Sequence, residues 1–430
     1  MLKPVGASCN LRCDYCYYLP VAEGYDAPAK RMSMQVLESV LAGYLPGAGE
    51  QVTLAWQGGE PTLAGLGWFE HMTTLVEKHR RPTQTVAHCL QTNGTLLDDA
   101  WGAFLREHRV LVGLSLDGLA ADHDHYRKDP AGRGSHSRVM DGLGVLRRHG
   151  VEHNVLVVLN DRNVGRPRAV WERLMGLGVD WVQFIPAVEW VKPQDESDRG
   201  DPDAWTTAPF SPTGAAYGRF LCDVFDRWFE KSRHRVSVRM FDAVLGVLVN
   251  GQAGECTYAP TCASQLTIEH DGSVYGCDHF VQPEWKLGRV GGGWGCGGEA
   301  AAELTVEGRS VAGEGSGGLD SDWMGRLDGS RFARFGARKG DLPSPCRVCE
   351  FRGWCRGGCP KHRTARGDLP GPNVLCDGYR AFYQHAGPRL GWLASYLKRG
   401  ETPPREAPAS LRPASAHRPR VKVRRTRKRR

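Results

Sequence analysis

Short apolar runs alternate with amphipathic segments along the first half of the chain. Apolar runs of strand length predict β-strands at 3–5, 51–56, 85–91, 110–116, 152–159 and 181–186. Apolar residues at helical spacing predict helices at 34–45, 68–78, 98–107, 137–149, 167–177 and 213–231. Strands that alternate with helices in this way are typical of a parallel sheet covered by helices.

Polar and glycine-rich motifs follow several of these strands directly. Gln57-Gly58-Gly59-Glu60-Pro61 follows the strand at 51–56, Thr92-Asn93-Gly94 the strand at 85–91, and Asp117-Gly118 the strand at 110–116. Active groups gather at the carboxyl ends of parallel strands. We therefore expect these motifs to meet at one end of the sheet.

The pattern changes after Gly254. Residues 192–212 predict a long loop before it, and 256–376 are rich in Cys and Gly and poor in long periodic elements. Such a region is typically held by metal in place of a large apolar core. Within it, 291–329 is nearly low-complexity and predicts an extended surface insertion, and 388–398 predicts a closing helix.

The net charge of +8 comes from the C-terminal segment. Residues 401–430 hold eleven Lys or Arg and two Glu, so they carry +9 and leave −1 for the other 400 residues. A near-neutral body is not typical of a nucleic-acid-binding protein. The composition of 401–430 predicts a disordered basic tail. We favour a tail that is simply solvated; the alternative is a weak contact with RNA, an acidic partner or a membrane surface.

The sequence predicts a cytoplasmic protein. It has no run of about 18 apolar residues that would span a membrane, and no apolar signal region precedes the first Cys motif. Fourteen Cys in such a chain indicate metal centres rather than disulfides.

Three of these cysteines form a tight motif, Cys9-x3-Cys13-x2-Cys16. Three thiolates leave one iron of a cubane iron–sulfur cluster free for a substrate or cosubstrate. A structural zinc site needs a fourth ligand nearby, but the next Cys is Cys89 and no His precedes His71. We favour the cluster over three unrelated thiols.

A second Cys system occupies the C-terminal half. Its eight thiols suffice for two four-Cys sites, and they are Cys256, Cys262, Cys277, Cys346, Cys349, Cys355, Cys359 and Cys376. Two zinc sites are the alternative to iron–sulfur clusters. Of the remaining cysteines, we expect Cys89 to be a buried strand residue, Cys222 a helix residue and Cys296 a loop thiol.

Together these motifs resemble the anaerobic sulfatase-maturating enzymes, which are radical S-adenosylmethionine (SAM) enzymes with a SPASM domain. The resemblance rests on the three-Cys motif with Tyr15, on Trp-Gln-Gly-Gly-Glu-Pro-Thr-Leu at 56–63, on the motifs at 91–94 and 115–118, and on the eight-Cys block. It implies an α/β fold: a partial (β/α)6 radical SAM barrel at 1–232, a SPASM auxiliary-cluster domain at 233–390 with the insertion at about 291–329, and the basic tail at 401–430.

The resemblance also implies the cofactors, which are SAM and three 4Fe–4S clusters. Cys9, Cys13 and Cys16 would hold the SAM-binding cluster. The first auxiliary cluster would take Cys256, Cys262, Cys277 and Cys359, and the second Cys346, Cys349, Cys355 and Cys376, although spacing alone would group 346–359 as one site. The expected SAM contacts are Tyr15, Gly59, Glu60, Ser115, Arg127 and Val188.

The implied reaction oxidises a Cys or Ser side chain of an unfolded or nascent sulfatase to Cα-formylglycine. Asp278 would be the general base and an auxiliary cluster the electron acceptor; without the resemblance, a turn residue is the less favoured alternative for Asp278. The implied partners are the sulfatase polypeptide and a reducing electron donor such as flavodoxin or ferredoxin. The alternative is a SPASM-type maturase of a ribosomally made peptide, and a metal-stabilised non-enzyme is a weaker one.

Overall fold

A six-stranded parallel sheet forms the centre of the protein. The computed structural model describes residues 1–25, 31–191, 205–262, 265–291, 319–366 and 369–411. The strands lie in the order β10-β7-β6-β4-β3-β2, so each neighbours the next in the chain and the sheet is open, with β10 and β2 as its edges. Their bounds are β2 Gln51–Trp56, β3 Thr85–Thr92, β4 Leu111–Ser115, β6 His153–Leu159, β7 Trp181–Pro186 and β10 Ser237–Val238.

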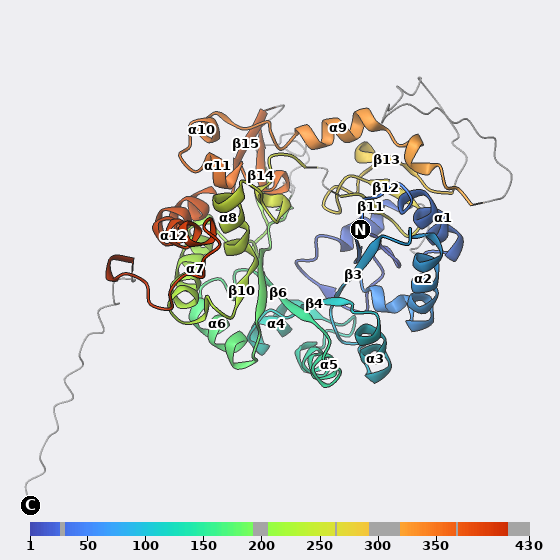
Figure 1. Ribbon diagram of the computed structural model, residues 1–430, viewed down its shortest axis with the longest axis horizontal. Coiled ribbons are helices and arrows are strands. Elements are labelled where there is room, and N and C mark those ends of the chain that lie inside the picture. The colour runs from blue at the N-terminus through green and yellow to red at the C-terminus, as the bar shows by residue number, and fades with distance from the viewer. Residues whose placement is uncertain (26–30, 192–204, 263–264, 292–318, 367–368, 412–430) are drawn as a thin grey trace, which may run out of the picture.

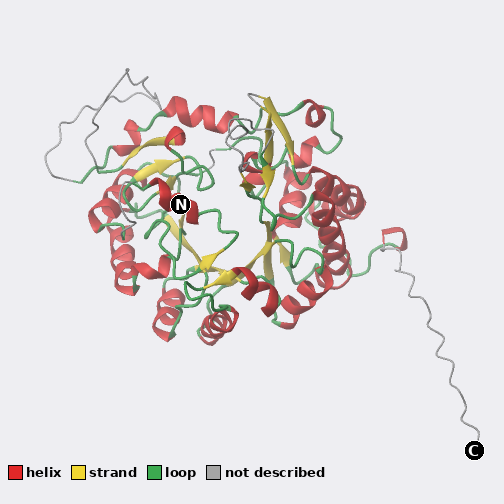
Figure 2. Ribbon diagram, turned by 180° about the vertical axis from the view of Figure 1, so that it is seen from behind, coloured by secondary structure: helices red, strands yellow, loops and turns green. Residues whose placement is uncertain are grey.

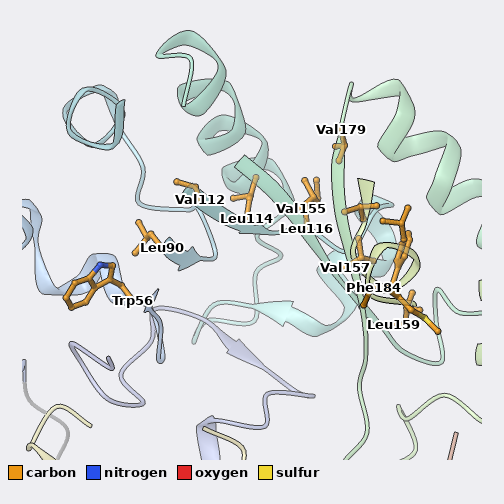
Figure 3. Packing of buried hydrophobic residues seen from close by; sticks show 14 of the residues in the cluster. Trp56, Leu90, Val112, Leu114, Leu116, Val155, Val157, Leu159, Val179 and Phe184 are labelled. Carbon is orange, nitrogen blue, oxygen red and sulfur yellow. The ribbon is translucent and has the colours of Figure 1, made fainter. Parts of the chain in front are cut away.

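Alternate residues of these strands are buried on the side that the helices cover. In β6, for example, Val155, Val157 and Leu159 are fully buried, whereas the residues between them are only partly buried. Figure 3 shows these side chains beside those of the neighbouring strands, in one continuous row under the helices. The other face of the sheet is thus left for polar side chains and loops.

Helices cover the outside of the curved sheet (Figure 2). They are α1 Met34–Tyr44, α2 Leu66–His79, α3 Asp99–Glu107, α5 His136–Arg148, α6 Pro167–Gly176 and α7 Gly214–Arg227. Three begin at capping side chains, because Ser33, Asp98 and Thr213 each accept a hydrogen bond from a backbone N–H of the first turn. The predicted helices and five of the predicted strands are therefore confirmed, with shifts of one or two residues at their ends and a π-helical turn, Trp228–Ser232, after α7.

Some predictions of secondary structure were wrong, and some observed elements were not predicted. No strand forms at 3–5; instead Leu2 alone bridges to Trp56 and to Ile268. The predicted closing helix is longer than expected, since α12 runs from Cys376 to Leu397 with Pro388 inside it. The pattern also missed α8 Arg239–Asn250, α4 Ala120–Tyr126, and β10 before α8.

The Cys-rich region consists of short elements on one side of the barrel, at the upper edge of Figure 1. A three-stranded antiparallel sheet contains β11 Thr267–Ile268, β12 Ser273–Tyr275 and β13 Lys286–Arg289. The helices α9 Gly329–Ala337, α10 Ser344–Arg347 and α11 Arg352–Cys355 follow, and then the hairpin of β14 Arg363–Arg366 and β15 Leu369–Asn373.

Helix α12 returns from this region and packs against α7 of the barrel (Figure 1). Glycines let the two helices approach closely: a Cβ atom on Gly378 would lie 2.2 Å from the carbonyl oxygen of Gly214. Asp226 of α7 also accepts hydrogen bonds from His385 and Arg389 of α12, both at 2.6 Å. The last helix therefore ties the Cys-rich region back to the barrel.

Several predicted features lie wholly or partly outside the described residues. Most of the predicted loop at 192–212 is among them, as are 292–318 of the predicted insertion with Cys296, and 412–430 of the predicted tail. The first part of that tail, 401–411, is described and lies against the body, because Arg233 donates hydrogen bonds to the carbonyl oxygens of Pro404 and Arg405. No helix in the described part of the chain is long and apolar enough to cross a membrane.

Replacing Gly378 by alanine tests the helix contact. We expect Gly378→Ala to lower the free energy of unfolding by about 1–3 kcal/mol, because the new methyl group overlaps Gly214. Gly391→Ala is the matched control, since nothing lies within 4 Å of its added Cβ on the same helix. That change should leave stability equal or raise it by up to about 1 kcal/mol. Denaturant unfolding of both variants measures the difference, and equal stabilities would contradict the packing argument.

Candidate functional site

The three-Cys loop lies at the carboxyl end of the sheet, against the Gly-Gly turn that follows β2. The N–H of Gly59 donates to the carbonyl oxygen of Gly6 at 2.7 Å, and that of Glu60 to the carbonyl oxygen of Ser8 at 2.9 Å. A Cβ on Gly59 would lie 2.0 Å from the Ser8 oxygen. Only glycine therefore allows the loop to pack here. This packing explains why residue 59 is a glycine, whether or not it also contacts SAM.

Glu60 is fully buried, and its carboxylate joins the ends of β2 and β3. It accepts hydrogen bonds from the N–H and hydroxyl of Thr62, from the hydroxyl of Thr92 at 2.7 Å and from the N–H of Asn93 at 2.7 Å. Burial raises the pKa of Glu60, and these donors oppose that rise. Both carboxylate oxygens are thus engaged within the protein, and contact with a SAM ammonium group stays a prediction.

The loop holds its three thiols by backbone and side-chain contacts. The N–H of Leu11 donates to Cys9 Sγ at 3.4 Å. Cys13 pairs with Arg127, because strand β1 Arg12–Cys13 lies antiparallel to strand β5 Arg127–Lys128. The N–H of Cys16 donates to the carbonyl oxygen of Cys13 at 3.0 Å. Burial raises the pKa of Cys9 to about 11 and that of Cys13 to about 12. A cationic iron centre stabilises thiolates in such a place, so this donor set fits a three-thiolate cluster.

A buried ion pair lies directly behind the loop. Arg127 donates to Asp117 through Nε at 3.0 Å and Nη2 at 3.3 Å, and the hydroxyl of Tyr15 donates to the same carboxylate. Burial alone would raise the pKa of Asp117, but Arg127, His123 and the Tyr15 hydrogen bond together outweigh burial and lower that pKa. Tyr15 and Arg127, both predicted to contact SAM, are thus brought together by Asp117, which the sequence had placed in a strand-end motif without assigning it this role.

Two further residues connect this ion pair to the barrel. The N–H of Asp117 donates to His123 Nδ1 at 3.3 Å, His123 Nε2 lies 3.0 Å from the Ser135 hydroxyl, and that hydroxyl donates to the carbonyl oxygen of Arg127 at 2.8 Å. Burial lowers the pKa of His123 to about 4, so the ring is neutral and can accept at Nδ1 while it donates from Nε2. No motif in the sequence signals this connection.

The other two predicted SAM contacts differ in their surroundings. Ser115 ends β4 and its hydroxyl accepts from Gln91 Nε2 at 3.2 Å, so the two side chains meet across neighbouring strands. Val188 follows β7 and is buried in the main hydrophobic core. Their contact with SAM stays a prediction.

Asp278 lies beside the cluster loop, although it comes from the Cys-rich region. The hydroxyl of Tyr17 donates to Asp278 Oδ2 at 2.6 Å, and Gln57 Nε2 donates to the same hydroxyl at 3.0 Å. The ammonium group of Lys3, which is fully buried, lies 3.5 Å from Asp278 Oδ2. Burial alone would raise the pKa of Asp278, but Lys3, the neighbouring His279 and the Tyr17 hydrogen bond hold it well below its usual range.

Sequence reasoning missed Lys3, Tyr17 and Gln57 as neighbours of Asp278. Tyr17 directly follows Cys16, and Gln57 directly precedes the Gly-Gly turn, so both lie beside motifs that were recognised. The ring of His279 stacks on that of Tyr17, with centroids 4.4 Å apart. The carboxylate is therefore surrounded by side chains from both halves of the protein.

Four thiols of the second Cys system line one cavity. It measures about 30 Å³, and its lining includes Cys346, Cys349, Cys355 and Cys376, with the rings of Tyr379 and Tyr383. These are the four thiols that the resemblance assigns to one cluster. A cavity lined by thiols and aromatic rings fits an iron–sulfur cluster.

The other four thiols affect one another electrostatically. Each of these thiols has its pKa raised by at least one other of the four, beyond the larger effect of burial; they are Cys256, Cys262, Cys277 and Cys359. The buried ammonium of Lys339, which donates to the carbonyl oxygens of Thr257 and Gly358, opposes this rise.

In the described part of the chain, no three His, Cys, Asp or Glu side chains are arranged to hold a single metal ion.

The chain is similar to known proteins in both sequence and structure. The family model of the Radical SAM superfamily matches residues 4–183. The chain is 35% identical over 413 residues to the serine-type anaerobic sulfatase-maturating enzyme of Bacteroides thetaiotaomicron, covering 94% of this chain and 92% of that protein. It is 30% identical over 402 residues to the cysteine-type enzyme of Clostridium perfringens, covering 93% and 98%. A solved structure of native anSMEcpe with bound AdoMet and Cp18Cys peptide superposes with a TM-score of 0.77 at 30% identity, covering 92% of this chain and 98% of that one.

Gly59→Ala tests whether the Gly-Gly turn holds the three-Cys loop in place. We expect the variant to lose most of the iron bound by Cys9, Cys13 and Cys16, because the methyl group displaces the Ser8 backbone. Iron and sulfide analysis after anaerobic reconstitution measures this loss. Gly67→Ala is the control, since its added Cβ meets only the end of the Glu70 side chain at 3.9 Å. Normal iron content in Gly59→Ala would contradict the packing role.

Proposed function

Because the chain belongs to the anaerobic sulfatase-maturating enzymes of the radical SAM superfamily, we propose that it oxidises a Cys or Ser side chain of a sulfatase to Cα-formylglycine. The observation that carries this proposal is the contact between Tyr17 and Asp278. Tyr17 directly follows a thiol of the first Cys motif and Asp278 directly follows a thiol of the second, and their side chains are 2.6 Å apart. A proton acceptor thus lies between the two predicted cluster sites.

The reaction removes a hydrogen atom, a proton and an electron from one target side chain. Cys9, Cys13 and Cys16 would hold the cluster that binds SAM, and SAM would supply the acceptor of the hydrogen atom from the target Cβ. Asp278, which is ionised in its buried site, accepts the thiol or hydroxyl proton. The neighbouring Cys277 would help to hold an auxiliary cluster, which would supply the acceptor for the remaining electron. A Cys target would then give a thioaldehyde, which water hydrolyses to the aldehyde.

We also propose three 4Fe–4S clusters, with the eleven ligands named above. The supporting observations are the buried three-Cys loop, the cavity shared by the second set of auxiliary thiols, and the electrostatic effects among the thiols of the first set. Three clusters require about twelve irons per chain. Fully reconstituted protein should therefore bind about twelve irons and as many sulfides.

The remaining SAM contacts follow the same reasoning. Tyr15 and Arg127 form the buried wall behind the three-Cys loop, and Ser115 lies at the end of β4 near Gln91. We propose that the protein works in the cytoplasm, where thiols stay reduced, with a flavodoxin or ferredoxin as electron donor. The polypeptide substrate is an unfolded or nascent sulfatase, since a folded one would hide the target side chain.

A peptide assay tests the proposed function. Reconstituted protein is incubated anaerobically with SAM, a reductant and either of two peptides that carry Cys-x-Pro-x-Arg or Ser-x-Pro-x-Arg. We expect a mass loss of about 18 Da from the Cys peptide, or of about 2 Da from the Ser peptide. Since both target types occur among the relatives, either result supports the proposal. SAM cleavage with both peptides unchanged would instead favour the alternative, a maturase of another ribosomally made peptide.

Asp278→Asn tests the assignment of the base. Asparagine keeps the size of the side chain and loses the proton-accepting charge, so formylglycine formation should fall by at least about 100-fold, within the range of general-base effects. SAM cleavage to 5′-deoxyadenosine should continue, because the three-Cys loop is unchanged. Mass spectrometry of the peptide and chromatography of 5′-deoxyadenosine measure the two outcomes. Formylglycine at the normal rate would show that Asp278 is not the base.

A further inference from the structure

Lys3 is a fully buried cation whose backbone is fixed from two sides. The N–H of Leu2 donates to the carbonyl oxygen of Ala55 at 2.7 Å, and the carbonyl oxygen of Leu2 accepts from Gln57, so this residue extends the edge of β2. The N–H of Lys3 donates to the carbonyl oxygen of Ile268 in β11 at 2.9 Å. The position of the Lys3 side chain is therefore set by the barrel and by the Cys-rich region together.

Two contacts fix the end of this side chain. Its ammonium group lies 3.5 Å from Asp278 Oδ2 and 4.3 Å from the centroid of the Tyr18 ring. Tyr18 is held in turn, because its hydroxyl donates to the buried carboxylate of Glu269. Within the described residues, Asp278 is the one carboxylate that forms an ion pair with Lys3. Burying an ammonium group costs free energy unless the group is paired with an opposite charge. The ion pair with Asp278 therefore accounts for the buried position of Lys3.

The contacts of Asp278 are divided unequally between its two oxygens. Oδ2 receives both the Tyr17 hydroxyl, at 2.6 Å, and the Lys3 ammonium, at 3.5 Å. Oδ1 has the Cys277 sulfur at 3.6 Å. A thiol is a weak donor, and a cysteine that ligates iron has lost its proton and donates nothing. With a cluster in place, Oδ1 is the oxygen with capacity to accept a proton.

We propose that Lys3 is a positioning residue for Asp278, which anchors Oδ2 so that Oδ1 is left to accept the proton of the target side chain. This inference rests on the proposed function. Lys3 itself touches neither substrate nor SAM in this account and acts only through the carboxylate. Loss of Lys3 therefore uncouples the reaction: hydrogen-atom removal continues, while proton removal fails.

The test replaces Lys3 by methionine, which has a similar length and no charge, and uses anaerobically reconstituted full-length protein. The readouts are formylglycine formed per 5′-deoxyadenosine released, the peptide Kd, and the iron content. We expect Lys3→Met to lower formylglycine per 5′-deoxyadenosine at least tenfold, with a peptide Kd within twofold of the parent. Lys78→Met is the matched control, since Lys78 pairs with Glu38 at 2.6 Å on the surface and its loss should change none of the readouts.

Two conservative variants separate positioning from folding. Lys3→Arg keeps the charge and Lys3→Gln keeps only a hydrogen-bond donor, so coupling should be better in the arginine variant. This comparison decides the question if Lys3→Met fails to bind iron. In the double variant Lys3→Met/Asp278→Asn, we expect the same formylglycine per 5′-deoxyadenosine as in Asp278→Asn alone, because Lys3 then has no carboxylate to position.

Three results would overturn the proposal. They are normal coupling in Lys3→Met, equal coupling in Lys3→Arg and Lys3→Gln, or a peptide Kd weakened tenfold with normal coupling, which would make Lys3 a substrate-binding residue. Failure of the proposed function is distinguishable, because the parent protein itself would then form no formylglycine.

Discussion

The backbone hydrogen bonds of residues 2–3 join the two halves of the protein. Leu2 pairs with the edge of β2, and Lys3 bonds to the end of β11, so one short segment continues the barrel sheet into the Cys-rich region. This connection fixes where the Cys-rich region lies relative to the carboxyl ends of the barrel strands. The helix α12, packed on α7 at the opposite edge of the sheet, holds the same region from its other end (Figure 1). Asp278 can therefore lie beside a loop that precedes it by more than 250 residues.

The site is polar, buried and almost fully hydrogen-bonded within the protein. Glu60 and Asp117 each receive several donors from strand ends and loops, which offset the cost of burying their charges in part for Glu60 and in full for Asp117. Together with the backbone hydrogen bonds from Gly59 and Glu60, these contacts fix the position of the three-Cys loop. Orientation of the cofactors and the target side chain is the main contribution of such a protein, because the radical chemistry belongs to the cofactors.

The sequence predicted the barrel well, because each strand carries a local alternation of buried residues and each motif follows its strand directly. The Cys spacing and the strand-end motifs indicated the family, which the relatives then established. Lys3, Tyr17 and His123 were missed because their partners lie far away in the sequence or are single atoms of the backbone. Helix α12 was expected to start at Pro388, yet it begins at Cys376, since Arg389 and His385 anchor both sides of the proline to Asp226.

In the proposed mechanism, the three-Cys loop and Asp278 act on the same target side chain. A peptide deuterated at the Cβ of its target residue tests this claim most directly, with mass spectrometry of both the released 5′-deoxyadenosine and the peptide. We expect 5′-deoxyadenosine to gain deuterium in step with the formylglycine that forms. Formation of unlabelled 5′-deoxyadenosine while formylglycine accumulates would contradict it, because hydrogen removal would then occur at a different atom from the one that is oxidised.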